Sequence, residues 1–241
     1  MNAKADQAKA RRIVAQHAMT SALLGVEFVP LARALEPKPD ADPDSAHARM
    51  RALEAKYKRD APHKDFDTQF NSIVFGDGDP CARLMFIGEA PGADEDRLGK
   101  PFVGRSGQLL NKMIAAMGFS RERVYIANVL KTRPPGNATP TAVEVEACKP
   151  YLIEQIRIVS PEVIVTLGLP AARCLLETND SMGNLRNRFH NFEVAPGHVI
   201  PVMPTYHPAY LLRAYTPENR KKVWSDLQMV LDRLGMAPAS A

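Results

Sequence analysis

The residues best suited to chemistry stand where short apolar segments end. Glu89 lies in the turn GEAPG after RLMFIG, Asn128 follows the apolar run VYIA, and His207 comes shortly after HVIPVMPT. A carboxylate, a carboxamide and an imidazole can exchange protons with a polar ligand or hydrogen-bond to it. The GEAPG turn lacks both the Gly-Lys-Ser/Thr of a phosphate loop and the G-x-G-x-x-G of a dinucleotide fold, so neither of those sites is expected.

The elements that must position these residues alternate between short apolar runs and longer helical patterns. Such alternation indicates parallel strand pairing in a layered α/β sheet. In an open parallel sheet, ligands bind beyond the carboxyl ends of the strands, which is where Glu89, Asn128 and His207 are expected. The predicted strands are 83–88, 123–130, 162–168 and 198–205, and the predicted helices are 106–118, 141–159, 170–177 and 217–234.

The N-terminal part of the chain has a different pattern. Residues 1–24 are rich in Ala, Lys and Arg and predict a helix, and 44–58 predict a second, charged helix. Between them, residues 36–50 are rich in proline and acidic side chains, which is typical of a solvated linker. We therefore expect a helical N-terminal extension at 1–65, a main domain at 66–236 and a flexible tail at 237–241.

Composition and charge narrow the class of protein. Of the 241 residues, 45% are hydrophobic and 24% charged, the balance of a soluble globular protein. No apolar run is long enough to span a bilayer, and no signal peptide follows the basic N-terminus, so a cytoplasmic protein without a membrane partner is expected. The net charge of +4 permits a polyanionic partner without requiring one.

The chain has three cysteines, Cys81, Cys148 and Cys174, and no C-x-x-C pair. Three widely spaced thiols are too few for a four-thiolate cluster or a cysteine-rich zinc site. We expect them to be reduced and to pack as small hydrophobic side chains.

Four segments in order give the chain a family resemblance. They are GEAPGADEDRLGKPFVGRSGQLL (88–110), YIANVLKTRPPGN (125–137), EVEACKPYL (144–152) and TYHPAYLLR (205–213). Together they resemble the family 4 uracil-DNA glycosylases of the uracil-DNA glycosylase superfamily, over roughly residues 72–235. The resemblance implies a three-layer α/β/α fold with a central four-stranded parallel sheet. It also implies a DNA-repair enzyme that hydrolyses the N-glycosidic bond of uracil and leaves an abasic site.

The family motifs assign roles to four residues. Phe102 matches the aromatic residue that stacks on the extruded base, and Asn128 matches the amide that reads the uracil edge. His207 matches the histidine that donates to uracil O2, where negative charge develops on the leaving base. Glu89 matches the acid that positions or activates the attacking water, or steadies the sugar cation. The alternatives are a core phenylalanine, a turn asparagine, a structural histidine and a turn glutamate.

The same resemblance extends to neighbouring residues. Glu95 falls where the family places a side chain near uracil C5, and Gly88 and Ala90 are expected to contact the base with Glu89. The loop after His207 is expected to enter the duplex, and basic residues near the motifs to meet phosphates, with solvated charges as the alternative. The expected DNA-binding residues are Lys131, Arg133, Pro134, Tyr210, Leu211 and Arg213, with Leu212 beside the wedge and Lys100 and Arg105 as further phosphate contacts.

The chain departs from the family at its cluster motif. Family 4 enzymes usually hold a [4Fe–4S] cluster on four cysteines. Here Thr132 stands at one of the four positions, Cys148 retains another, and residues 52–66 contain no cysteine for the remaining pair. We therefore expect no iron–sulfur cluster and no other cofactor or metal, with the N-terminal extension packed over the cluster position.

Three functions remain open at this stage. The first is uracil excision from DNA by a monofunctional, monomeric glycosylase. The second is a non-catalytic protein that binds uracil or abasic DNA, which retention of all four motif residues disfavours. The third is a glycosylase for deaminated purines, since the small Ala90 leaves room for other bases. The resemblance also implies no covalent trapping of DNA. The branch of the family that captures uracil-DNA covalently has a long basic insertion with a histidine, whereas the loop 133–140 is short and contains no histidine.

Overall fold

The computed structural model describes residues 42–66 and 70–236, which fold around a six-stranded sheet of order β1-β3-β2-β4-β6-β5. The inner strands β3, β2, β4 and β6 are parallel, and β1 and β5 pair antiparallel at the two edges. The strands are β1 (Asp77–Gly78), β2 (Leu84–Gly88), β3 (Tyr125–Asn128), β4 (Val163–Leu167), β5 (His190–Ala195) and β6 (His198–Thr205). The predicted four-stranded parallel core is confirmed.

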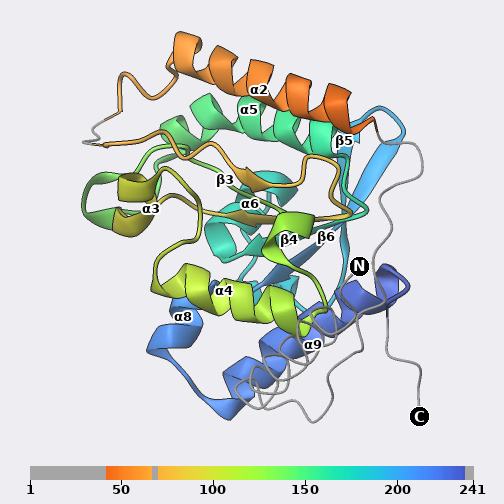
Figure 1. The fold of residues 1–241 in the computed structure, drawn as a ribbon. Coiled ribbons are helices and arrows are strands. Elements are labelled where there is room, and N and C mark those ends of the chain that lie inside the picture. The colour runs from red at the N-terminus through yellow and green to blue at the C-terminus, as the bar shows by residue number, and fades with distance from the viewer. Residues whose placement is uncertain (1–41, 67–69, 237–241) are drawn as a thin grey trace, which may run out of the picture.

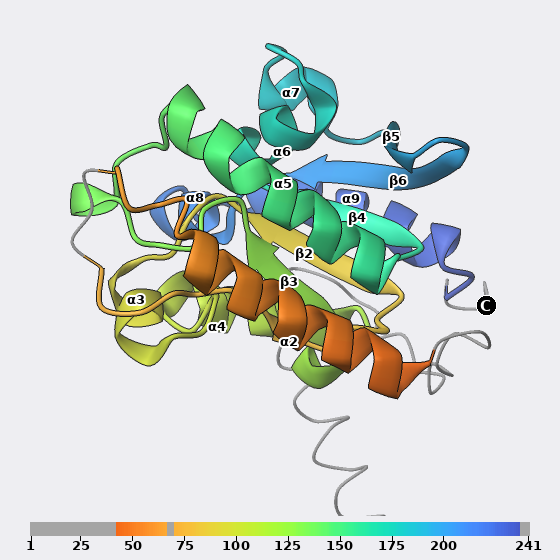
Figure 2. The ribbon, with the colours of Figure 1, turned by 90° about the horizontal axis from the view of Figure 1, so that it is seen from above.

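Helices cover both faces of the sheet, which makes the three layers (Figures 1 and 2). The helices α2 (Pro43–Asp60), α5 (Ala142–Val159) and α6 (Leu169–Leu176) pack on one face. The helices α4 (Arg105–Ala116), α8 (Pro208–Arg213) and α9 (Pro217–Arg233) pack on the other. The short elements α3 (Ala93–Leu98), η1 (Arg121–Arg123), η2 (Pro135–Asn137) and α7 (Met182–Leu185) lie in the connections.

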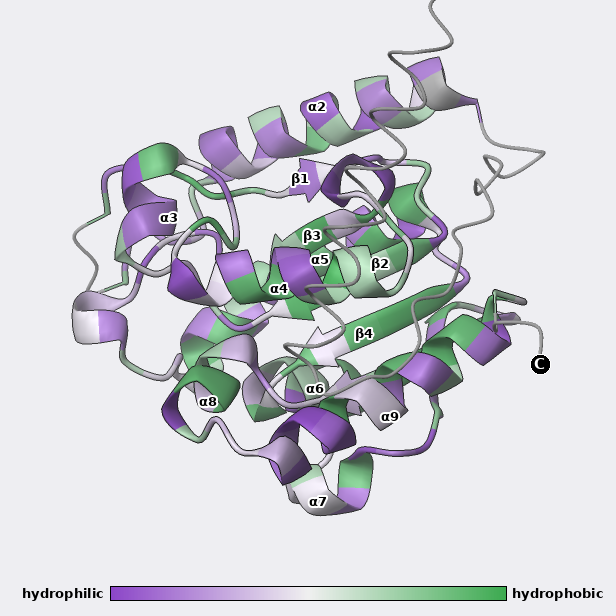
Figure 3. Cartoon of the chain, turned by 60° about the horizontal axis from the view of Figure 1, so that its bottom comes forward, coloured by the Kyte–Doolittle hydropathy of each residue, from purple (hydrophilic) through white to green (hydrophobic). Residues whose placement is uncertain are grey.

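The inner strands are largely apolar because each of their faces meets a helical layer. In β2, Met85 and Ile87 join the core shared with α5, while Leu84 and Phe86 join the core shared with α4 and α9. Figure 3 shows this distribution, with hydrophobic central strands and helices that carry hydrophilic residues outward. The sheet is therefore a rigid base for the loops at its carboxyl edge.

Helix α2 confirms the charged helix predicted at 44–58 and begins one residue earlier, at Pro43. The predicted linker at 36–50 is wrong from Pro43 onward, because Asp42 caps the helix by accepting from the backbone N–H groups of Asp44 and Ser45. Pro43 occupies the first turn, where its missing N–H costs nothing. The predicted helix at 1–24 and the tail at 237–241 lie outside the described residues.

The remaining differences concern short or half-exposed elements. Strand β5 was not predicted, because an edge strand alternates polar and apolar residues and HNFEVA has too few of the latter. The predicted domain boundary near residue 65 stays a prediction, although Met50, Leu53 and Tyr57 of α2 pack into the same core as the sheet. Among the described residues, no helix is both long and apolar enough to cross a membrane.

Candidate active site at the carboxyl edge of the sheet

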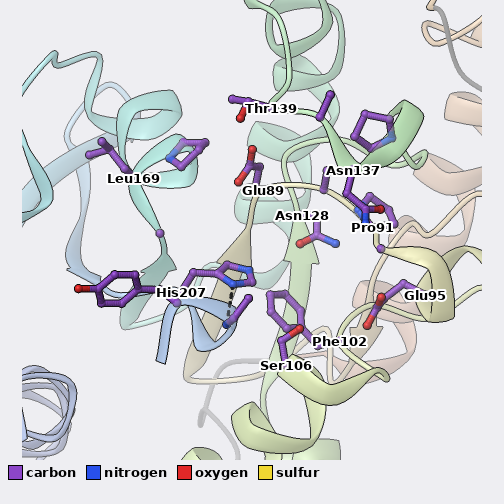
Figure 4. A pocket seen from close by; sticks show the side chains of 18 of the residues that line it. Glu89, Pro91, Glu95, Phe102, Ser106, Asn128, Asn137, Thr139, Leu169 and His207 are labelled. Carbon is purple, nitrogen blue, oxygen red and sulfur yellow. Dashed lines mark hydrogen bonds between the residues drawn. The ribbon is translucent and has the colours of Figure 1, made fainter. Parts of the chain in front are cut away.

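A cavity of about 640 Å³ opens where β2, β3, β4 and β6 end. Its size is in the usual range for small-molecule sites. Figure 4 shows side chains from loops far apart in the sequence converging on it. The lining residues are Glu89, Ala90, Pro91, Gly92, Glu95, Phe102, Ser106, Asn128, Pro134, Asn137, Ala138, Thr139, Gly168, Leu169, Pro170, Met182, Tyr206, His207, Ala209, Tyr210 and Arg213.

Asn128 presents an unpaired acceptor to this cavity. Its side chain is buried at the end of β3, and its Oδ1 has no hydrogen-bond partner among the described residues. A buried polar atom is normally satisfied, so an orphan beside a cavity indicates a ligand donor. Backbone bonds from Val129 N to Gly88 O and from Leu130 N to Glu89 O, both 3.0 Å, continue the β2–β3 pairing into the two loops. Asn128 and Glu89 are therefore held in fixed register.

Phe102 forms part of the cavity wall, on a loop with unusual backbone geometry. The residue has φ +51°, a left-handed conformation that bulky side chains rarely adopt. Glu95 stabilises this loop, because its Oε1 accepts from Val103 N at 2.8 Å and from Gly104 N at 2.9 Å. Glu95 is thus both a lining residue and a structural acceptor, and its predicted contact with the base stays a prediction.

His207 lies next to Phe102 in the lining of the cavity, with ring centroids 5.6 Å apart and planes inclined by 32°. It is the N-cap of α8, and its Nδ1 accepts from Ala209 N at 3.0 Å, the dashed line in Figure 4. A ring nitrogen that accepts from a backbone N–H carries no proton, so the neutral ring holds its hydrogen on Nε2. Burial, followed by the nearby Arg213 charge, lowers the pKa of His207 to about 4.

Glu89 also lines the cavity. It is half-buried in the loop after β2, and burial raises the pKa of its carboxyl above the ordinary glutamate value. The raised pKa makes this carboxylate more basic than a solvated one. The cavity therefore combines an aromatic face, an unpaired amide oxygen, a neutral imidazole donor and a carboxylate.

The structure brings most of the predicted site residues together. Glu89, Ala90, Glu95, Phe102, Asn128, Pro134, His207, Tyr210 and Arg213 all line the cavity. Gly88 lies behind it, against Asn128 and Phe102. Arg133 is not among the lining residues, and its Nε donates to Asn137 Oδ1 at 2.9 Å. Lys100 and Arg105 are exposed, and their predicted phosphate contacts stay predictions.

Two predicted DNA contacts are wrong. Lys131 is 0% exposed, and its Nζ donates to Asn128 O at 2.6 Å and to Gln155 Oε1 at 2.5 Å. The chain turns inward after β3, so this ammonium group stabilises the core under the site and reaches no phosphate. Leu211 is also 0% exposed, because α8 packs it against α4 in the hydrophobic core.

One side of the cavity was missed at the sequence level. Gly168, Leu169 and Pro170 follow β4, and Met182 begins α7. Strand β4 was predicted, and ligands in parallel sheets bind beyond the carboxyl ends of the strands. The loop after β4 could therefore have been predicted as part of the site. Ser106, on the first turn of α4, gave no comparable signal in the sequence.

Comparisons with known proteins agree with this geometry. The family model for the Uracil DNA glycosylase superfamily matches residues 75–228. A Type-4 uracil-DNA glycosylase of Saccharolobus solfataricus is 43% identical over 172 residues, which cover 69% of this chain and 78% of the relative. The Type-4 enzyme of Thermotoga maritima is 41% identical over 157 residues, covering 65% and 80%. A Type-5 uracil-DNA glycosylase of Pyrobaculum aerophilum is 34% identical over 149 residues, covering 56% and 64%.

These relatives correct the cofactor prediction. The expectation of no cofactor is contradicted, because the Type-4 enzymes are the family that usually holds a [4Fe–4S] cluster. Cys148 is buried with its Sγ 3.8 Å from the Tyr57 hydroxyl, and no three His, Cys, Asp or Glu side chains in the described ranges gather as metal ligands. These side chains do not fit four-thiolate ligation among the described residues.

The layered fold, the position of the cavity and the matches over most of the chain all lead to one assignment. The chain belongs to the uracil-DNA glycosylase superfamily, with Type-4 enzymes among its relatives.

Proposed function

We infer that this protein is a monofunctional uracil-DNA glycosylase that hydrolyses the N-glycosidic bond of uracil in DNA and leaves an abasic site. The observation that carries the proposal is the convergence of Phe102, Asn128 and His207 on one cavity. A stacking face, an amide and an imidazole donor are the groups needed to hold an extruded pyrimidine and stabilise its departure. The relatives at 41–43% identity carry the same activity in their names.

In this proposal the base lies against the ring of Phe102 and is read by Asn128. The unpaired Oδ1 of Asn128 accepts from uracil N3–H, and its amide N–H donates to O4. Cytosine has an acceptor at N3 and a donor at C4, so it opposes this pattern at both positions. Because a flipped amide would match cytosine instead, uracil selectivity in this proposal requires the Asn128 amide to keep one orientation.

Breaking the glycosidic bond leaves negative charge on uracil and positive charge on the sugar. The Nε2–H of His207, whose position is set by the Nδ1 bond to Ala209 N, donates to uracil O2 as the charge grows. A neutral ring can do this without first giving up hydration of a full charge, which the low pKa of His207 supports. The Glu89 carboxylate, on the sugar side, positions the attacking water and steadies the cation.

The exposed rim supplies the contact with DNA. Tyr210 lies at the cavity mouth, 37% exposed, and stacks on Tyr206 with ring centroids 4.8 Å apart. A rigid aromatic pair can fill the space that an extruded base leaves. Arg213 and Pro134 border the same opening and are proposed to contact the backbone. We propose that a monomer carries out this reaction in the cytoplasm.

The activity is tested on a labelled oligonucleotide containing one uracil, treated with alkali to cleave abasic sites. We expect cleavage at uracil, and a loss of at least about a hundredfold in His207→Ala and Asn128→Ala. Matched controls are His198→Ala and Asn191→Ala, which remove exposed residues of the same types far from the cavity, and should retain wild-type rates.

Other outcomes would overturn the proposal in distinct ways. A retarded DNA complex with no product would indicate a binding protein. Product only from hypoxanthine- or xanthine-containing strands would indicate a glycosylase for deaminated purines. Strand cleavage without alkali would contradict monofunctional action.

A further inference from the structure

Arg121 lies outside the cavity but binds the backbone of the loop that carries Phe102. Its Nη1 donates to Phe102 O at 3.0 Å, and its Nη2 donates to Pro101 O at 2.5 Å. Two adjacent carbonyl groups are thus bound by one guanidinium, whose planar fork suits paired acceptors. Neither Arg121 nor its element η1 lines the cavity, so this contact acts on the site from behind.

The guanidinium is itself held by two other elements. Its Nε donates to Asp77 Oδ2 on β1 at 3.0 Å, and its Nη1 also donates to Asn111 Oδ1 on α4 at 2.9 Å. The Arg121 side chain is 18% exposed, so these bonds are shielded from water on most sides. Arg121 therefore connects the edge of the sheet and α4 to the loop.

The loop needs such support because its conformation is strained. Phe102 has φ +51°, a conformation in which the Cβ atom is crowded by the backbone of the same residue. Without support, the loop would relax to another conformation. On the far side of the same peptides, Glu95 binds the next two amides, Val103 N and Gly104 N. The loop also packs closely on α4, since a Cβ at Gly107 would lie 2.0 Å from Phe102 O.

We propose that Arg121 is a positioning residue for base excision: it fixes the left-handed backbone of Phe102, with Glu95 binding the opposite side of the loop, so that the ring is ready to stack on the extruded base. The inference rests on the proposed function and deepens it, because it explains what holds the Phe102 ring in place before the base binds. Arg121 acts only through Phe102 and touches no substrate. Its contribution must therefore vanish when the aromatic ring is absent.

A double-mutant cycle tests this dependence. Single-turnover excision of uracil is measured for wild type, Arg121→Met, Phe102→Ala and the double variant. We expect Arg121→Met to slow excision at least tenfold in the presence of Phe102 and less than twofold in the Phe102→Ala background. Arg121→Lys should recover only part of the loss, because an ammonium group cannot bind both carbonyls as a fork does. Equal losses in both backgrounds would overturn the proposal.

A second measurement does not depend on activity. Hydrogen exchange of the segment 101–104 should accelerate in Arg121→Met, while β4 at the centre of the sheet stays protected. Arg83→Met is the matched control, because Arg83 also joins distant elements through Glu162 and Leu234 O but lies at the opposite end of β2. It should leave both the exchange of 101–104 and the Phe102 coupling unchanged.

The two proposals fail in different ways. If wild type does not release uracil, the activity is wrong, and hydrogen exchange still decides whether Arg121 orders the loop. If wild type excises uracil but segment 101–104 exchanges equally in wild type and Arg121→Met, the activity stands and the positioning role is wrong.

Discussion

The side chains of Asn128 and Phe102 both lie against the bare Cα of Gly88. A Cβ built there would be 2.4 Å from Asn128 Oδ1 and 2.5 Å from Phe102 Cζ. Only glycine leaves room for the reading amide and the stacking ring to sit side by side at the end of β2. The predicted substrate contact of Gly88 stays a prediction, and the structure adds a requirement for close packing against Asn128 and Phe102.

Gly88→Ala should therefore separate activity from stability. The two contacted atoms are ends of side chains, so the fold can adapt at a cost of about 1 kcal/mol. Displacing the amide or the ring by about 1 Å is expected to slow uracil excision by about a hundredfold. Urea unfolding and single-turnover rates measure the two effects, with Gly183→Ala as a control at an uncrowded glycine. A full rate in Gly88→Ala would show that the packing is not needed.

The sequence predicted the part of the fold that hydrophobic burial determines. Strands β2, β4 and β6 and helix α5 were predicted because long apolar runs and periodic patterns carry a strong signal. Strand β5 and helix α7 were not predicted, because a half-exposed edge strand and a single-turn helix carry few apolar residues in a regular pattern.

Site residues could be predicted from the sequence where they directly follow a strand. They could not be predicted where a contact depends on whether the side chain points to the cavity or to the core. Asn128 and His207 were located from their motifs, and the structure places both in the cavity. Lys131 and Leu211 are neighbours of such residues in the same motifs, yet their side chains point into the core. Successive side chains of an extended segment point to opposite faces, so a shift of one residue exchanges the two faces. The charge of a lysine does not reveal which face it occupies.

The acid limb of the pH–rate profile should report two groups in order. Glu89 acts as a carboxylate and His207 as a neutral ring, so both are active above their pKa values and lost below them. Burial raises the pKa of Glu89 and lowers that of His207 to about 4, so Glu89 is protonated first as pH falls. Wild-type excision should thus decline at a pH above the ordinary glutamate pKa.

Replacing Glu89 separates the two titrations. In Glu89→Gln, the slower residual excision should stay constant with falling pH until about 4 and then decrease about tenfold per pH unit. Circular dichroism at each pH controls for acid unfolding, and a reaction without enzyme controls for acid depurination. A decline of Glu89→Gln beginning near 6.5 would mean that His207 titrates as an ordinary solvated histidine, against the burial argument.

Lys131→Met should destabilise the protein without changing how its DNA affinity depends on salt. The substitution keeps the volume but leaves Asn128 O and Gln155 Oε1 as buried acceptors without a donor. Each such loss typically costs about 1–3 kcal/mol, which urea unfolding can measure. A lysine at the DNA surface would give the reverse result: unchanged stability and a shallower dependence of DNA affinity on salt.

Arg213→Ala should give that reverse result. Arg213 is exposed at the cavity rim, and removing one phosphate contact is expected to make the negative slope of log affinity against log salt shallower by about 1. The nearby charge of Arg213 also lowers the pKa of His207, so the same variant should shift the His207 titration upward in the Glu89→Gln background. Arg51→Ala, at an exposed position on α2, should change neither quantity. If the salt dependence of DNA affinity becomes shallower but the pKa of His207 does not move, Arg213 contacts DNA without acting on His207. A charge that influences the imidazole must shift its pKa whether or not DNA is bound.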